Sequence, residues 1–205
     1  RIDEEMLRGE TRMKNPLDSL HQTLGLGLVI VIILALCLHF GLYGEKAYWQ
    51  FIFRWLHVFF GILWIGLLYY FNFVQTPSMP KIPDEQKPAI SKVIAPAALY
   101  YFRWAAAFTV LTGLILGWLN GWIDRALLLQ PPARTIGIGM WLALIMAFNV
   151  WFIIWPNQKK VLGIVQVDAA QKPKAARMAG LASRINTLLS LPMLYCMIAQ
   201  THMPS

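Results

Sequence analysis

Five apolar stretches, each about as long as a membrane is thick, constrain what this chain of 205 residues can fold into. About 20 apolar residues in a helix cross the hydrocarbon core of a bilayer. Backbone groups in lipid must form their hydrogen bonds within the segment, so each stretch is expected to be an α-helix. The predicted helices cover residues 23–43, 48–74, 95–122, 135–155 and 181–201.

The predicted fold class is therefore all-α: an integral membrane bundle of five transmembrane helices. The chain is 58% hydrophobic, and a soluble domain of this size could not bury that much apolar surface. Residues 1–22 are polar and charged, and we expect them to form a cytoplasmic surface tail. Residues 23–205 are expected to form one five-helix membrane domain.

The distribution of Lys and Arg predicts the orientation of the bundle. Short cytoplasmic loops collect basic residues. The predicted helices separate a side of the membrane rich in Lys and Arg from a side with few of them. This places the N-terminus in the cytoplasm and the C-terminus outside. The basic side holds Arg1, Arg8, Arg12, Lys14, Lys81, Lys87, Lys92, Lys159, Lys160, Lys172, Lys174 and Arg177. These charges flank apolar spans and form no patch interleaved with aromatic residues, so a bilayer and not a nucleic acid is the expected partner.

Three of the four histidines fall near the outer ends of the predicted helices. They are His39, His57 and His202, and His21 lies elsewhere. An imidazole in a membrane span is costly and usually marks a functional site. Three at one face of the bilayer predict a metal or heme position.

The surroundings of His57 favour heme b. Gly61 follows four residues later, on the same face of the helix, and leaves room for a flat ligand to lie against the backbone. Arg54 precedes His57 by three residues, and its guanidinium could pair with a heme propionate. The sequence alone allows a simpler interpretation as well, in which His57 only hydrogen-bonds a carbonyl or a lipid headgroup.

A six-coordinate heme needs a second ligand, and the sequence leaves two candidates open. His39 lies one short turn before the second helix, which favours it by proximity. His202 ends the fifth helix at the same predicted face. Copper is an alternative metal because soft sulfur ligands suit it. The methionines near His202 are Met193, Met197 and Met203.

Other polar residues in the spans are few. Asn149 and Asn186 fall toward the inner half and are expected to hydrogen-bond across helices, and Arg103 is expected to snorkel to the inner interface. The predicted spans contain no Asp or Glu, which argues against a proton pump or an ion-coupled transporter. Cys37 and Cys196 belong to no C-x-x-C-H motif, so no covalently attached heme c is expected.

Several stretches resemble the membrane domain of the urate oxidase N-terminal family. They are Arg54–Gly66, Arg103–Gly113, Asn149–Lys160 and Ser183–Pro192, and the likeness extends over roughly Tyr48 to Pro204. That family includes a bacterial membrane-bound urate hydroxylase whose membrane part precedes a cytochrome c domain. That cytochrome c domain is absent from this sequence. The resemblance implies a multi-pass protein of the bacterial inner membrane, with its C-terminus in the periplasm, and a heme-type role for His57.

The sequence departs from the family pattern at two places. Ile185 stands where the family's Ser-Arg-His-Asn pattern has histidine. The fifth helix ends in Gln200-Thr201-His202, where the family has an Asn-His pair one position away. His57 matches the family motif directly.

Three functions follow as expectations. The first is a heme b-binding membrane subunit that exchanges electrons with a periplasmic cytochrome c or a larger redox complex. The second is a urate hydroxylase-like oxidoreductase that works with a separate cytochrome. The third is a cofactor-free accessory subunit of a respiratory or photosynthetic complex.

Overall fold

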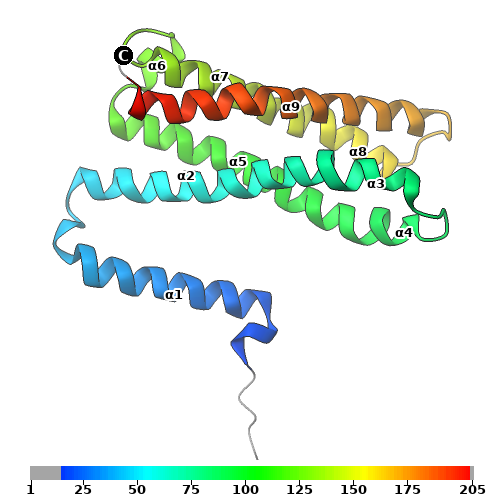
Figure 1. Ribbon diagram of the computed structural model, residues 1–205, viewed down its shortest axis with the longest axis horizontal. Helices are drawn as coiled ribbons and strands as arrows, with labels where there is room; N and C mark the ends of the chain where they lie inside the picture. The colour runs from blue at the N-terminus through cyan, green and yellow to red at the C-terminus, as the bar shows by residue number, and fades with distance from the viewer. Residues whose placement is uncertain (1–14, 204–205) are drawn as a thin grey trace, which may run out of the picture. The chain divides into compact units, whose positions relative to one another are not determined.

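A computed structural model describes residues 15–203 (Figure 1). Helices and no strands occur in this part of the chain. Five helical segments are long and apolar enough to cross a membrane, so the all-α prediction with five such helices is confirmed. They cover Leu20–Leu42, Lys46–Lys81, Lys87–Asn120, Arg134–Val161 and Gln171–His202. The basic residues Arg1, Arg8, Arg12 and Lys14 lie outside the described residues, and the orientation in the membrane stays a prediction.

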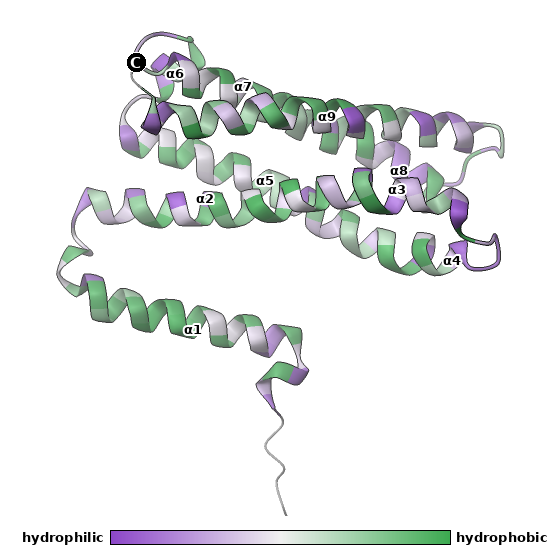
Figure 2. Ribbon diagram, in the orientation of Figure 1, coloured by the Kyte–Doolittle hydropathy of each residue, from purple (hydrophilic) through white to green (hydrophobic). Residues whose placement is uncertain are grey.

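The chain divides into two compact units, Arg1–Tyr48 and Trp49–Ser205. The described part of the first unit contains η2 (Pro16–Asp18), α1 (Leu20–His39) and η3 (Phe40–Leu42). None of the residues in α1 is buried, and Figure 2 shows hydrophobic residues along most of its length. A helix that is apolar on all sides is typical of lipid contact.

The second unit is a bundle of four long helical segments. Its first segment runs through α2 (Lys46–Tyr69), η4 (Tyr70–Gln75), α3 (Thr76–Ser78) and η5 (Met79–Lys81). The second runs through α4 (Lys87–Ala89), η6 (Ile90–Ile94) and α5 (Ala95–Asn120). After α6 (Ile123–Leu127), the third comprises α7 (Arg134–Phe148), η7 (Asn149–Ile154) and α8 (Trp155–Val161), and α9 (Gln171–His202) is the fourth.

The two ends of this bundle differ in composition. The turn between α3 and α4, the helix α8 and the start of α9 lie at one end (Figure 1), where Figure 2 shows many hydrophilic residues. We call it the Lys-rich end, after Lys81, Lys87, Lys92, Lys159, Lys160, Lys172 and Lys174. The start of α2, the end of α5, the helix α6 and the end of α9 lie at the other end, which we call the histidine end after His202.

Prolines explain three π-helical segments in the bundle. Pro77, Pro96 and Pro156 follow η4, η6 and η7 by one or two residues. A proline inside an α-helix lacks an N–H and collides with the carbonyl four residues earlier. Those carbonyls belong to Phe73, Lys92 and Phe152, each inside a π segment. The wider π turn therefore accommodates each proline without ending the helix.

The prolines also bear on where the predicted helices end. Residues 75–94 lie between two predicted helices, whereas in the structure helical turns cover all of them except residues 82–86. Pro77 and Pro88 stand in first-turn positions of α3 and α4, where a helix tolerates proline. The fourth loop is also shorter than expected, because α9 already begins at Gln171.

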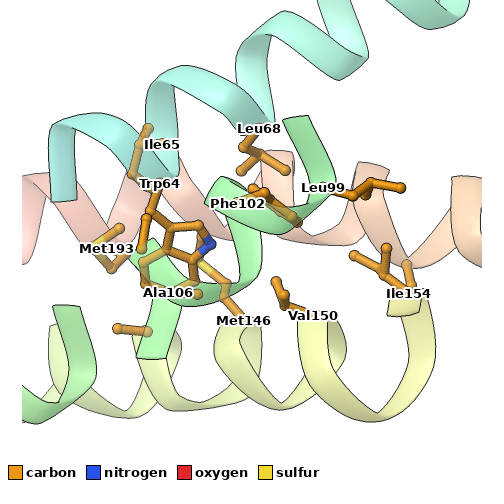
Figure 3. Packing of buried hydrophobic residues seen from close by; sticks show 13 residues of the cluster. Trp64, Ile65, Leu68, Leu99, Phe102, Ala106, Met146, Val150, Ile154 and Met193 are labelled. Atoms are coloured by element: carbon orange, nitrogen blue, oxygen red, sulfur yellow. The ribbon is translucent and has the colours of Figure 1, made fainter. Parts of the chain in front are cut away.

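Side chains from all four segments meet in one apolar core (Figure 3). Trp64 and Leu68 of α2 contribute the largest buried groups together with Phe102 of α5. Met146 and Val150 come from the third segment, and α9 adds Ala182 and Met193. A smaller cluster at the histidine end joins Ala126, Ala133, Ile136 and Met140.

Candidate functional site

The imidazole of His57 joins α2 to α5. Its Nδ1 lies 2.8 Å from the backbone oxygen of Thr109. A carbonyl oxygen only accepts hydrogen bonds, so Nδ1 carries the proton and Nε2 keeps the free lone pair in the neutral ring. The Thr109 hydroxyl donates to Ala105 O at 2.7 Å, and the Thr112 hydroxyl donates to Phe108 O at 2.6 Å. These hydroxyls are therefore held by their own helix.

Gly113 makes the close approach of His57 possible. A Cβ at this position would lie 2.8 Å from Cε1 of His57 and 3.0 Å from Nδ1. The sequence analysis missed this role. The available signal was that Thr109, Thr112 and Gly113 stand at i, i+3 and i+4, which places two hydroxyls and one glycine on a single face of a helix.

Gly61 also faces α5. A Cβ there would lie 3.9 Å from the Thr109 methyl group, so the space beside Gly61 is bounded by α5. Arg54 lies one turn before His57 and is exposed, and among the described residues it forms no ion pair. The structure therefore puts Gly61 and His57 on one helix face, while the helix that covers this face is α5.

The other two predicted ligands are in different surroundings. His39 is part of the first unit, where its ring centroid lies 6.5 Å from that of Tyr48. His202 is exposed at the end of α9, and its Nδ1 lies 2.8 Å from the Thr201 hydroxyl and 3.0 Å from Ile198 O. Within the second unit, His57 and His202 have separate hydrogen-bond partners.

His57 and His202 nevertheless lie at similar depths in the second unit. Trp64 and Met193 share the core cluster and so mark one level of the bundle (Figure 3). At 1.5 Å per residue, His57 is about 10 Å from that level and His202 about 14 Å, both toward the histidine end.

Two of the methionines near His202 are held in packing contacts. Met193 is 5% exposed and belongs to the core, and Met197 packs against Gly139. Within residues 15–203, no group of three or more His, Cys, Asp or Glu side chains could hold a metal ion. Nε2 of His57 is the nitrogen that keeps a free lone pair, because a backbone carbonyl orients the ring through the other nitrogen.

A second polar system joins the third segment and α9 near the middle of the bundle. The Asn149 amide donates to Oδ1 of Asn186 at 2.8 Å, and the Asn186 amide donates to Met146 O at 2.9 Å. The predicted hydrogen bond between these asparagines is confirmed. The Tyr69 and Ser190 hydroxyls lie 2.9 Å apart and join α2 to α9 in the same way.

Arg103 was expected to snorkel to the inner interface, and in the structure its guanidinium packs on two tryptophans. Its Cζ lies 3.3 Å from the ring centroid of Trp155 and 6.0 Å from that of Trp151. Nε and Nη1 are buried and have no hydrogen-bond partner among the described residues. The aromatic faces therefore hold the cation in place of water or headgroups.

Comparison with known proteins gives one family match. The model of the family described as urate oxidase N-terminal matches residues 120–205, which is less than half of the chain. The predicted resemblance to this family is confirmed for that part, which includes Asn149–Lys160 and Ser183–Pro192. His57 lies outside the matched residues. No curated protein and no solved structure matches the chain.

Proposed function

We propose that this chain is the membrane subunit of an oxidoreductase, with heme b held by His57 as one axial ligand. The subunit would exchange electrons with a periplasmic cytochrome c or with a larger redox complex. The observation that carries the proposal is the hydrogen bond from Nδ1 of His57 to Thr109 O.

This hydrogen bond prepares an imidazole for ligation. Histidines that bind metals usually donate their second nitrogen to a carbonyl or carboxylate, which fixes the tautomer and makes the ligating nitrogen more basic. Thr109 O supplies that acceptor, and Gly113 gives the ring its place against α5. Arg54 would offer its charge to a propionate at the membrane surface. A bound heme b would supply one-electron chemistry.

His202 and His39 compete for the second axial position. His202 has the support of depth, because it lies within a few ångströms of the level of His57 along the bundle. His39 has the support of sequence, because only a short turn separates its helix from α2.

The urate hydroxylase-like function is the second candidate. It rests on the family match over residues 120–205, which covers the most specific motif around Pro156. It is weakened by Ile185, which replaces a histidine of the family pattern.

A cofactor-free accessory subunit is the third candidate, and one observation favours it. The contacts of His57 with Thr109 and Gly113 are also what a histidine needs in order to join two helices without any ligand. In addition, α2 exposes large apolar side chains to its surroundings, including Trp55, Phe59 and Ile62. Such a face suits lipid or another membrane subunit.

A reduced-minus-oxidised absorption spectrum of the purified chain distinguishes these candidates. We expect an α-band of heme b, its loss in His57→Ala, and an unchanged band in the control His21→Ala. The variant His39→Ala or His202→Ala that alters the band identifies the second ligand. A chain purified from heme-replete cells without an α-band would refute the heme proposal and favour the accessory subunit. Consumption of urate dependent on an added cytochrome c would support the second candidate.

A further inference from the structure

Two adjoining hollows lie toward the Lys-rich end of the second unit. The first is a cavity of about 90 Å³ between η4, α5, η7, α8 and α9. The second is an open groove of about 430 Å³ along η4 and α9. Asn72 and Arg184 line both, so the cavity and the groove meet at these two side chains.

The cavity contains hydrogen-bond acceptors that lack donors. Oε1 of Gln75 is buried and receives no hydrogen bond from the described residues. The Asn72 amide nitrogen donates to Leu68 O at 2.9 Å and to the Ser183 hydroxyl at 2.8 Å. Its Oδ1 is then the atom left to accept. An unsatisfied buried acceptor costs about 1–3 kcal/mol, so a ligand with N–H or O–H groups would be favoured here.

Arg184 gives the junction a positive charge. The one ion pair within residues 15–203 joins Lys87 to Asp84, and Arg184 therefore has no carboxylate partner in that range. Arg184 lies about 20 Å along α9 from Gln171, where the predicted apolar stretch 181–201 begins, and this position suits a headgroup phosphate. Basic pockets between transmembrane helices are a common way of binding lipid headgroups.

The groove is apolar beyond Arg184. Its walls include Phe73, Leu188 and Leu191, which are 63%, 68% and 65% exposed. From Arg184 to Leu191 it follows α9 for about 10 Å toward the histidine end, along the apolar stretch 181–201. An acyl chain would lie along such a surface, whereas a phosphate ester without acyl chains, such as glycerol 3-phosphate, would gain no binding energy from it.

We propose that the cavity and the groove together bind a phospholipid that is anionic and has a headgroup with hydrogen-bond donors. Its phosphate pairs with Arg184, its headgroup donors reach Gln75 and Asn72, and one acyl chain follows the groove. Phosphatidylglycerol has all three features, and phosphatidylcholine is zwitterionic and has no headgroup donor. This inference is independent of heme binding, because His57 contributes to neither hollow.

Native mass spectrometry of the full-length, delipidated chain in detergent can test the proposal. The probes are phosphatidylglycerol, phosphatidylcholine and phosphatidylmethanol with matched acyl chains, together with glycerol 3-phosphate. We expect one phosphatidylglycerol per chain, bound at least about tenfold more tightly than phosphatidylcholine, as for one charge-assisted hydrogen bond. Phosphatidylmethanol is anionic without a headgroup donor and should bind with intermediate affinity.

Variants assign the parts of the site. Arg184→Gln should lower the affinity for phosphatidylglycerol about tenfold, whereas Arg177→Gln removes the same charge from the same helix outside both hollows and should leave it unchanged. Gln75→Leu should abolish the preference for phosphatidylglycerol over phosphatidylmethanol. A Cβ at Gly180 meets no atom within 4 Å, so Gly180→Leu should fill the cavity and weaken binding without touching the polar groups.

Three results would overturn the proposal. Equal binding of phosphatidylglycerol and phosphatidylcholine would remove its basis. Equal effects of Arg184→Gln and Arg177→Gln would show that lipid affinity follows the net positive charge of the chain and not the position of Arg184. Glycerol 3-phosphate bound as tightly as the lipid would mean that the groove plays no part. If Arg184→Gln does not fold, Gln75→Leu and Gly180→Leu decide the question.

Discussion

At the scale of single residues, the position of the His57 ring depends on the absence of a side chain at Gly113 of α5. The ring lies against the place that a Cβ of residue 113 would occupy, and its hydrogen bond goes to the backbone of Thr109. The position of the imidazole is therefore set by a missing side chain and by a main-chain oxygen. Neither can be inferred from the spacing of His57 and Gly61 on α2, which is why the sequence analysis found the histidine and missed its partner.

Gly113→Ala tests this dependence. The added methyl group would have to displace the His57 ring, and we expect a loss of about 1–3 kcal/mol in stability, as for other overpacked sites. Thermal unfolding in detergent measures it. Gly66→Ala is the matched control, because a Cβ at Gly66 meets no atom within 4 Å. Equal melting temperatures for the two variants would contradict the close contact.

At the scale of helices, sequence patterns predicted the spans better than their ends. The apolar runs gave five helices, because the length of a run is set by the thickness of the bilayer. The ends differed by up to ten residues, as at the start of α9. At Pro77, Pro96 and Pro156 the reason is that π turns accommodate prolines at which the predicted helices ended. The pairing of Asn149 with Asn186 was predictable because buried amides in a membrane need partners.

The asparagine pair allows a prediction about the packing of α9 on the third segment. Asn186→Leu should cost about 1–3 kcal/mol, because it leaves the Asn149 amide and Met146 O without their partners. The double variant Asn149→Leu with Asn186→Leu should recover part of that loss, because fewer unsatisfied polar groups remain. A double-mutant cycle of unfolding free energies measures the coupling. Strictly additive losses would argue against a pairwise interaction.

At the scale of the whole molecule, an odd number of spans separates the two ends of the chain. The described helices run from Leu20 to His202 in five segments that are long and apolar enough to cross a membrane. If each crosses the bilayer, residues 15 and 203 lie on opposite sides. The Lys and Arg residues of the loops predict which end of the bundle faces the cytoplasm. The helical fold alone does not, because the orientation depends on the bias of basic residues toward cytoplasmic loops.

Cysteine labelling of intact cells tests this arrangement. Cys37 and Cys196 are first replaced by Ala, because both are free thiols. With a membrane-impermeant maleimide, we expect Met203→Cys to react and Asn15→Cys to react only after the cells are opened. Labelling of both positions in intact cells would mean that one of the five segments does not span the membrane.

The π segments have a consequence for how positions along these helices are counted. Each shifts the hydrogen-bond register by one residue, and one residue corresponds to about 100° around a helix. Residues on either side of η7 that are seven apart therefore no longer share a face. Alignments, spin-label pairs or designed cross-links that cross residues 149–154 need an offset of one position to aim at the intended neighbour.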